Sequence, residues 1–337
     1  MTTRSGAESV LGRSFASVAQ LAWRLSARRV GVALVYHRVA QQPRDPGTSL
    51  VHTVSADLLA AQLRHLKARY QIVPASELLR AAAARRRGAR FPVAVTFDDD
   101  LESHNRLARP VLERLRVPAT FFVSGASDQA PRWWEALEAA FVQERAVPPG
   151  VRALLARGGR RLCERSGLAE VAEAIEALPR GERDAVAGAL RSWDRDEERM
   201  RADDVRELAR ARFAIGFHTL RHEPLPGLSD TDLERALAEG RDALAELAGR
   251  QVTAIAYPHG RADARVAAAA RAAGYAVGFT GRPEAVRPCS DPLLLGRLEP
   301  SQTSAGRFAL QIVRTLVARP RARFATGGRF PARRGPT

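Results

Sequence analysis

Cysteine is scarce in this chain of 337 residues. Its two cysteines, Cys163 and Cys289, lie far apart, and neither belongs to a C-x-x-C pair. This pattern excludes a disulfide-built scaffold and is consistent with a reducing compartment. Long apolar segments are missing too, since no run approaches the ~20 residues that a membrane-spanning helix requires. Arg13 and Arg24 interrupt the N-terminal apolar residues, so we expect a cytoplasmic protein without a signal peptide or transmembrane helix.

Lysine and aromatic residues are also rare. Lys67 is the only lysine, so arginine supplies almost all of the 53 basic residues behind the net charge of +16. Nucleic-acid sites gather basic and aromatic side chains, whereas here the arginines are scattered and aromatic residues make up 6% of the chain. We therefore expect no nucleic-acid partner. The sequence does not indicate an oligomeric state.

The two ends of the chain differ from its middle. Residues 1–28 have apolar residues at helical spacing, which predicts an amphipathic helix. Such a helix either packs on the rest of the protein or lies on a membrane surface. The positive charge favours anionic surfaces, so peripheral association with the inner membrane surface stays open. Residues 301–337 are expected to form a helix over 305–317 and a basic tail.

Between these ends, short apolar runs alternate with helical patterns over residues 29–300. The apolar runs predict strands over 31–36, 92–97, 119–123, 213–217, 254–257 and 275–280. The helical patterns predict helices after Ser55 and over 76–84, 105–115, 230–247 and 263–273. This alternation indicates an α/β fold with parallel strands and helices outside.

Residues 126–212 interrupt the alternation. They show no strand pattern and contain charge-rich helical segments over 168–178, 183–193 and 202–211. Trp133 and Trp134 open a further helix at the start of this segment. We interpret 126–212 as a helical insertion or cap within the α/β domain.

Side chains that can bind metals or transfer protons follow the predicted strands. His37, Asp98 with Asp99, His218 and His259 each come directly after an apolar run. The carboxyl ends of parallel strands meet at one edge of a sheet or barrel, where α/β folds place their active sites. We therefore expect these residues to gather at one site.

The histidines and carboxylates fit a metal site. His218 and His222 have the i, i+4 spacing at which two rings can share one ion on a helical turn. Such pairs also arise as ordinary core or surface histidines. Asp98 and Asp99 are adjacent like charges, which require a nearby positive charge unless they are solvated loop acids. Asp99 with His218 and His222 would form a two-histidine, one-carboxylate site with open positions, leaving Asp98 free as a base.

Three motifs resemble those of the polysaccharide deacetylases, also called the NodB homology domain or carbohydrate esterase family 4. They are Thr96-Phe97-Asp98-Asp99, His218-Thr219-x-x-His222 and Tyr257-Pro258-His259-Gly260. Their order and their apolar flanks agree with the family over residues 32–298, apart from the insertion. The resemblance implies a distorted (β/α) barrel and a divalent metal, most often Zn²⁺.

The resemblance also implies residue roles. Asp99, His218 and His222 match the metal ligands, Asp98 matches the general base, and His259 matches a position whose backbone N–H helps to bind the oxyanion. The family normally has a late histidine acid, but no histidine follows His259. The run Leu34-Val35-Tyr36-His37-Arg38-Val39 resembles a circularly permuted branch of exopolysaccharide deacetylases, which makes His37 the candidate acid.

Two positions depart from the family pattern. Asp100 stands where glycine is usual, and its carboxylate would either crowd the site or turn outward. The third motif lacks the arginine that often orients the base. Arg297, after an apolar run, either replaces that charge or forms a structural salt bridge.

The sequence therefore predicts metal-dependent hydrolysis of an N-acetyl group from an N-acetylated sugar in a polysaccharide or lipid-linked glycan. An O-acetyl esterase acting on acetylated polysaccharide and an inactive glycan-binding relative are the alternatives. Trp133 and Trp134 would either stack on sugar rings or pack within the insertion.

Overall fold

A computed structural model describes residues 25–42, 49–124, 133–144, 146–159, 162, 166–193 and 199–319. The amphipathic helix expected near the N-terminus, the basic tail beyond residue 319 and Cys163 lie outside these residues. The helix expected over 305–317 is present as α13, Ala305–Val317. Among the described helices, none combines the length and the apolar character needed to span a membrane.

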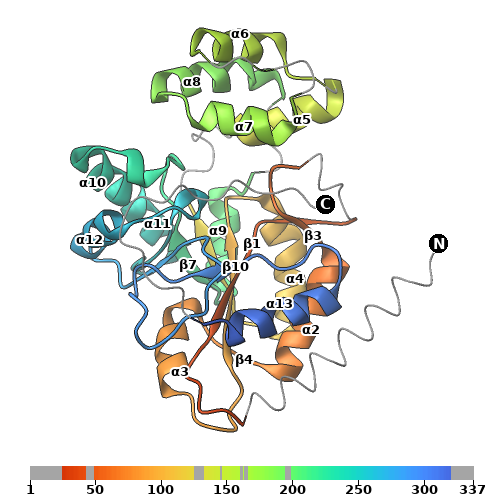
Figure 1. The fold of residues 1–337 in the computed structure, drawn as a ribbon, viewed down its shortest axis with the longest axis vertical. Helices are drawn as coiled ribbons and strands as arrows, with labels where there is room; N and C mark the ends of the chain where they lie inside the picture. The colour runs from red at the N-terminus through yellow and green to blue at the C-terminus, as the bar shows by residue number, and fades with distance from the viewer. Residues whose placement is uncertain are drawn as a thin grey trace, which may run out of the picture.

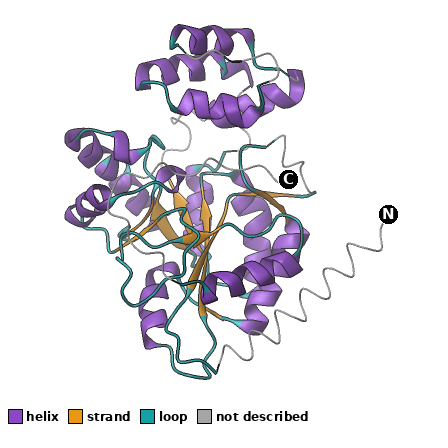
Figure 2. Ribbon diagram, viewed as in Figure 1, coloured by secondary structure: helices purple, strands orange, loops and turns teal. Residues whose placement is uncertain are grey.

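Parallel strands form the centre of the molecule (Figure 2). Their order is β10-β1-β5-β6-β7-β8-β9, and β4 pairs with β5. The strands are β1 Val32–Tyr36, β4 Gln71–Ile72, β5 Pro92–Asp98, β6 Thr120–Val123, β7 Ala214–Phe217, β8 Ala254–Ala256, β9 Val277–Phe279 and β10 Arg297–Leu298. A parallel bridge between Phe279 and Leu295 joins β9 to the segment before β10, so the sheet nearly closes on itself. This confirms the predicted distorted (β/α) barrel.

Helices surround the barrel, and the strands are buried because these helices cover them (Figure 1). They are α2 Ala56–Arg69, α3 Leu78–Ala84, α4 Arg109–Leu115, α9 Ala202–Arg210, α10 Asp230–Ala238, α11 Arg241–Ala248 and α12 Ala264–Ala272, with α13. Ser55 caps α2 by accepting a hydrogen bond from the Leu58 backbone N–H, as its position before the leucine-rich face predicts. Leucines of α2 and α13 then pack into the same core as β1 and β5.

The structure differs from the prediction in several elements. The helix expected over 230–247 is two helices, because Gly240 has φ of 86° between α10 and α11 and so interrupts the right-handed helix. The helix expected over 105–115 begins as a π-helical turn, His104–Ala108. A second sheet of β2, Arg38–Ala40, and β3, Thr53–Ser55, was not predicted, since such short strands carry little sequence pattern.

The helices between β6 and β7 divide between two cores. Four of them, α5 Trp133–Glu144, α6 Pro149–Arg157, α7 Leu168–Glu176 and α8 Arg180–Ala189, share their own apolar core. We call these four helices the helical cap, and Figure 1 shows it beyond one end of the barrel. α6 was not predicted. α9 lies within the expected 126–212 insertion but packs in the barrel core through Val205 and Leu208.

Candidate active site

The candidate site lies where β1, β5, β7 and β8 end. These strands carry His37, Asp98 with Asp99, His218 and His259 at or just beyond their last residues. Positive φ values mark the same place: in the described part of the chain six non-glycine residues have them, and four of the six are Asp99, Thr219, His222 and His259. Such conformations cost about 1–3 kcal/mol each and cluster at functional sites, where the surrounding structure imposes them.

The predicted metal ligands come together. Asp99 Oδ1 lies 3.4 Å from His218 Nε2 and 3.5 Å from His222 Nε2. N–H···O hydrogen bonds are shorter, about 2.7–3.2 Å. Ligands about 2.1 Å from a tetrahedral zinc ion lie roughly 3.4 Å apart, so the observed spacing fits an ion between these atoms. Among the described residues, no other three metal-ligating side chains gather this closely.

The histidine pair is held differently from the prediction. Residues 218–222 form a loop and not a helical turn, and the left-handed conformations of Thr219 and His222 turn the second ring toward the first. The two ring centroids are 4.9 Å apart. The spacing i, i+4 was therefore informative, but the helical geometry inferred from it was wrong.

The hydrogen bonding of His218 leaves its Nε2 available as a metal ligand. Its Nδ1 lies 2.8 Å from the Ala256 carbonyl of β8, to which a protonated Nδ1 donates, leaving Nε2 for a metal. Burial lowers the pKa of His218, but the neighbouring Asp98 and Asp99 outweigh burial, so its pKa is raised. Burial raises the pKa of Asp99, but His218, His222 and His37 outweigh it, and its pKa lies well below the ordinary value. Asp99 is therefore a carboxylate at neutral pH.

Asp98 is fixed by Arg297. Two hydrogen bonds of 2.6 Å join the guanidinium Nη1 and Nη2 to the two carboxylate oxygens, and both side chains are almost fully buried. Arg297 also donates to Thr96 Oγ1 at 3.2 Å. Burial raises the pKa of Asp98, but the positive charges of Arg297 and then of His218 lower it by more than burial raises it. The net shift of the Asp98 pKa is therefore downward. Arg297 thus supplies the charge that the third motif lacks.

Asp100 turns away from the metal ligands. Its carboxylate accepts hydrogen bonds from the Ser124 backbone N–H, at 2.8 Å, and from the Ser124 hydroxyl. Its backbone carbonyl accepts from the Met200 N–H at 2.8 Å. Asp100 therefore ties β5 to the end of β6 and leaves the site uncrowded, which settles the two alternatives left by the sequence.

His37 lies beside the carboxylates, close enough for its charge to lower the pKa of Asp98 and Asp99. Its Nδ1 is buried and accepts or donates no hydrogen bond among the described residues. Its backbone carbonyl contacts His104 Nε2 at 2.8 Å. Burial lowers the pKa of His104 to about 4, so this neutral histidine supports the His37 backbone. The His52 ring, which the sequence did not connect to the site, is 6.4 Å from the His37 ring.

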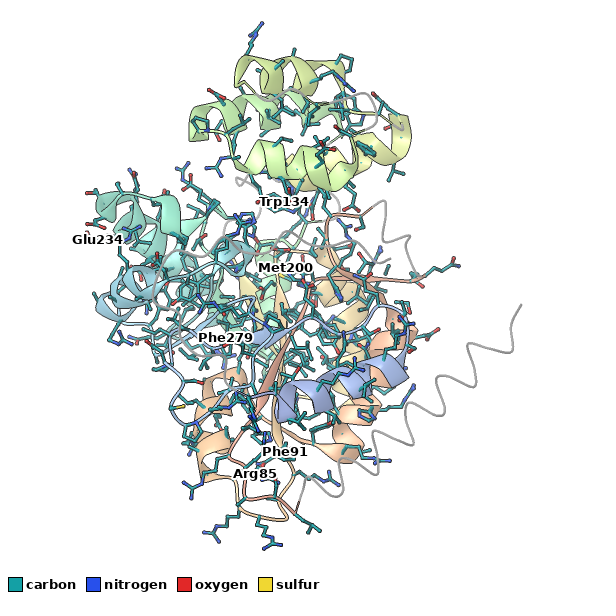
Figure 3. The ribbon with its side chains drawn as sticks, in the orientation of Figure 1. Arg85, Phe91, Trp134, Met200, Glu234 and Phe279 are labelled. Carbon is teal, nitrogen blue, oxygen red and sulfur yellow. The ribbon has the colours of Figure 1, made fainter. Side chains whose placement is uncertain are left out.

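Two residues of the helical cap, Glu176 and Trp134, contact residues of the site. Nothing in the sequence had pointed to Glu176. Glu176 at the end of α7 lies 3.2 Å from His259 Nδ1 and 3.4 Å from Arg261 Nη2. Trp134, one of the two tryptophans singled out in the sequence, lies with its ring 4.7 Å from the His222 ring. Figure 3 shows Trp134 between the cap and the barrel.

Comparison with known proteins agrees with the motifs. A family model described as polysaccharide deacetylase matches residues 170–278, which include the second and third motifs but neither Asp98 nor Asp99. Comparison with curated proteins gives no significant match.

Solved structures share the fold. The deacetylase PplD of Streptococcus pyogenes, determined with acetate, has 18% identity and a TM-score of 0.56, covering 84% of this chain and 98% of that one. IcaB of Ammonifex degensii has 22% identity and a TM-score of 0.54, covering 84% and 97%. A polysaccharide deacetylase of Bacillus cereus has 18% identity and a TM-score of 0.55, covering 84% and 69%.

These findings confirm the resemblance to polysaccharide deacetylases. The family model covers the second and third motifs, and the solved structures share the fold.

Proposed function

We propose that this protein hydrolyses an N-acetyl group from an N-acetylated sugar of a polysaccharide or lipid-linked glycan, in a metal-dependent reaction. One observation carries the proposal: Asp99, His218 and His222 cluster at metal-ligand spacing beside Asp98, which Arg297 holds as a carboxylate. The cation would be Zn²⁺ or a similar divalent ion, because two imidazoles and one carboxylate are typical zinc ligands.

Asp99, His218 and His222 would hold the ion. When bound there, a divalent cation would supply Lewis acidity, which polarises a carbonyl and lowers the pKa of water. Asp98 takes the proton of the attacking water, and the Arg297 pair keeps its carboxylate ionised and oriented. The two hydrogen bonds leave the Asp98 side chain little rotational freedom, so it meets the water in one geometry.

The other two site residues act on the tetrahedral intermediate, His259 as it forms and His37 as it collapses. The backbone N–H of His259 donates to the developing oxyanion, and the left-handed backbone at His259 sets the direction of that N–H. His37 in its protonated form donates to the leaving nitrogen. An amide requires this donation because an amine anion is a very poor leaving group.

Substitution of Asp98 by Asn tests the assignment of the base. We expect Asp98→Asn to bind zinc as the wild type does but to lose turnover by about a hundredfold or more, the usual contribution of a general base. Zinc is measured by metal analysis, and turnover by acetate release from an N-acetylglucosamine hexamer. Loss of zinc from the variant would contradict the role given to Asp98. Acetate release from an O-acetylated polysaccharide but not from the hexamer would favour the O-acetyl esterase.

A further inference from the structure

We infer that the helical cap closes one side of the active site, so that the enzyme deacetylates a sugar at one end of a glycan and not sugars within it. This inference rests on the proposed function. It concerns four cap residues, Trp134, Glu135, Glu138 and Glu176, and the barrel residues they contact.

Helix α5 crosses the mouth of the site. Trp134 lies against His222, which follows β7, while Glu138 pairs with Arg38, which follows His37 at the end of β1. Trp134 and Glu138 are one helical turn apart, about 6 Å along the axis. A single turn of α5 therefore contacts both flanks of the site, and a glycan running between those flanks would meet it.

The contact at Arg38 fixes α5 in this position. Arg38 is 4% exposed, and its Nη1 lies 2.5 Å from Glu138 Oε1, with Glu135 Oε1 3.7 Å from Nη2. Glu138 Oε2 also accepts from the Ser49 hydroxyl at 3.1 Å. Removing one partner of a buried pair is strongly unfavourable, so the cap is anchored at this end.

A more exposed contact holds the opposite side. Glu176 joins His259 and Arg261, whose side chains are 15% and 40% exposed, while Glu176 itself is 23% exposed. Partly exposed ion pairs of this kind contribute little each, about 0.2–1 kcal/mol. The buried pair of Arg38 and Glu138 therefore holds α5 on the barrel more strongly than the partly exposed contacts of Glu176 hold α7.

The free space around the site is one-sided. Beside Trp134, Glu176, His222 and His259 it amounts to about 50 Å³. A larger cavity of about 530 Å³ lies between α7–α8 and the loop after β7, lined in part by Arg183, Arg221 and Glu223. Ligand cavities typically measure ~300–1,000 Å³, so this one has room for the sugars that adjoin the reacting one. A glycan can thus enter from this side, while α5 stops it from leaving on the other.

Hydrogen exchange tests the cap without any substrate or metal. Glu176→Gln removes the charge that pairs with His259 and Arg261 at the end of α7. Glu173→Gln makes the same change at an exposed position of the same helix. We expect peptides covering 218–224 and 257–262 to exchange two- to fivefold faster in Glu176→Gln, the fold-change corresponding to one such ion pair, and unchanged in Glu173→Gln. Equal exchange in all three proteins would overturn the closed cap.

Product mapping tests the consequence for the substrate. The probes are the trimer and hexamer of N-acetylglucosamine, with zinc present, and mass-spectrometric fragmentation locates each deacetylated sugar. We expect the wild type to act at one end, with equal rates per molecule for both lengths. Interior deacetylation should rise two- to fivefold in Trp134→Ala, which removes the ring that α5 places beside His222, but not in Glu173→Gln.

Interior sugars reacting as fast as end sugars in the wild type would overturn the inference. Absence of acetate release from either probe would instead contradict the proposed function, while the exchange experiment still decides whether the cap closes the site.

Discussion

The buried pair of Arg297 and Asp98 provides the sharpest test of how the site is held. We expect Arg297→Met to leave the Asp98 carboxylate buried without the cation that binds both of its oxygens. The two side chains are 2% and 3% exposed, so water replaces little of what is lost. Breaking a buried pair by removing one partner costs about 3–5 kcal/mol, and we expect this loss in the free energy of unfolding near pH 7.

The loss should depend on pH in a definite direction. The pKa of Asp98 is lowered in the folded wild type, so its stabilising contribution is present above the unfolded pKa of about 3.9 and is lost as pH falls through the lower folded value. Without Arg297, burial is opposed only by weaker neighbours, and the pKa of Asp98 rises. The variant then protonates Asp98 as pH falls from 7, and the difference from the wild type shrinks.

Urea unfolding of the metal-free proteins at several pH values between about 4.5 and 7 measures both effects. Arg271→Met is the matched control, since Arg271 pairs with Asp291 at 3.0 Å with 55% of its side chain exposed. This surface pair should contribute about 1 kcal/mol or less. Wild-type stability of Arg297→Met near pH 7, or a deficit that does not change with pH, would refute this account of the pair.

Three further predictions concern the surroundings of the site. Ser124→Ala removes the hydroxyl bonded to the Asp100 carboxylate, and urea unfolding should show a loss of about 1.5–3 kcal/mol; no loss would mean that this contact is unimportant. Gly216→Ala places a Cβ into the Phe122 ring, so its midpoint in urea should fall by the equivalent of about 1–3 kcal/mol, and an unchanged midpoint would contradict the close packing of β7 on β6. Zinc at a hundredfold excess over its Kd should stabilise the wild type by about 2.7 kcal/mol in a thermal melt, and the effect should fade as pH falls through the raised pKa of His218, because protons compete with the ion; an increase in Tm that persists at lower pH would place the ion elsewhere.

The sequence predicted which residues gather at the strand ends better than it predicted what surrounds them. His37, Asp98, His218 and His259 follow apolar strands, and parallel strands bring their carboxyl ends to one edge whatever their separation in the chain. That rule places residues from distant parts of the chain in one site without any knowledge of loops. Arg297 does not obey this rule, because it opens the two-residue strand β10. It was a candidate only because the third motif lacks an arginine.

Loop geometry and contacts between distant helices were not predictable in the same way. The turn that joins His218 to His222 depends on left-handed conformations at Thr219 and His222, and a β-branched threonine rarely adopts such a conformation. Glu176 resembles any other acidic residue on a charged helix, so nothing in the sequence indicated its contact with His259. The contact of Arg38 with Glu135 and Glu138 likewise depends on how α5 packs against β2, which the sequence does not indicate.

Metal content tests the central claim most directly, because it needs no knowledge of the sugar. Purified wild type and His218→Ala are loaded with zinc, separated from free ion and analysed for metal. The site geometry predicts about one equivalent in the wild type and little in the variant, because the variant lacks one of three ligands. Zinc bound equally by both proteins, or by neither, would contradict the assignment of Asp99, His218 and His222 as a metal centre.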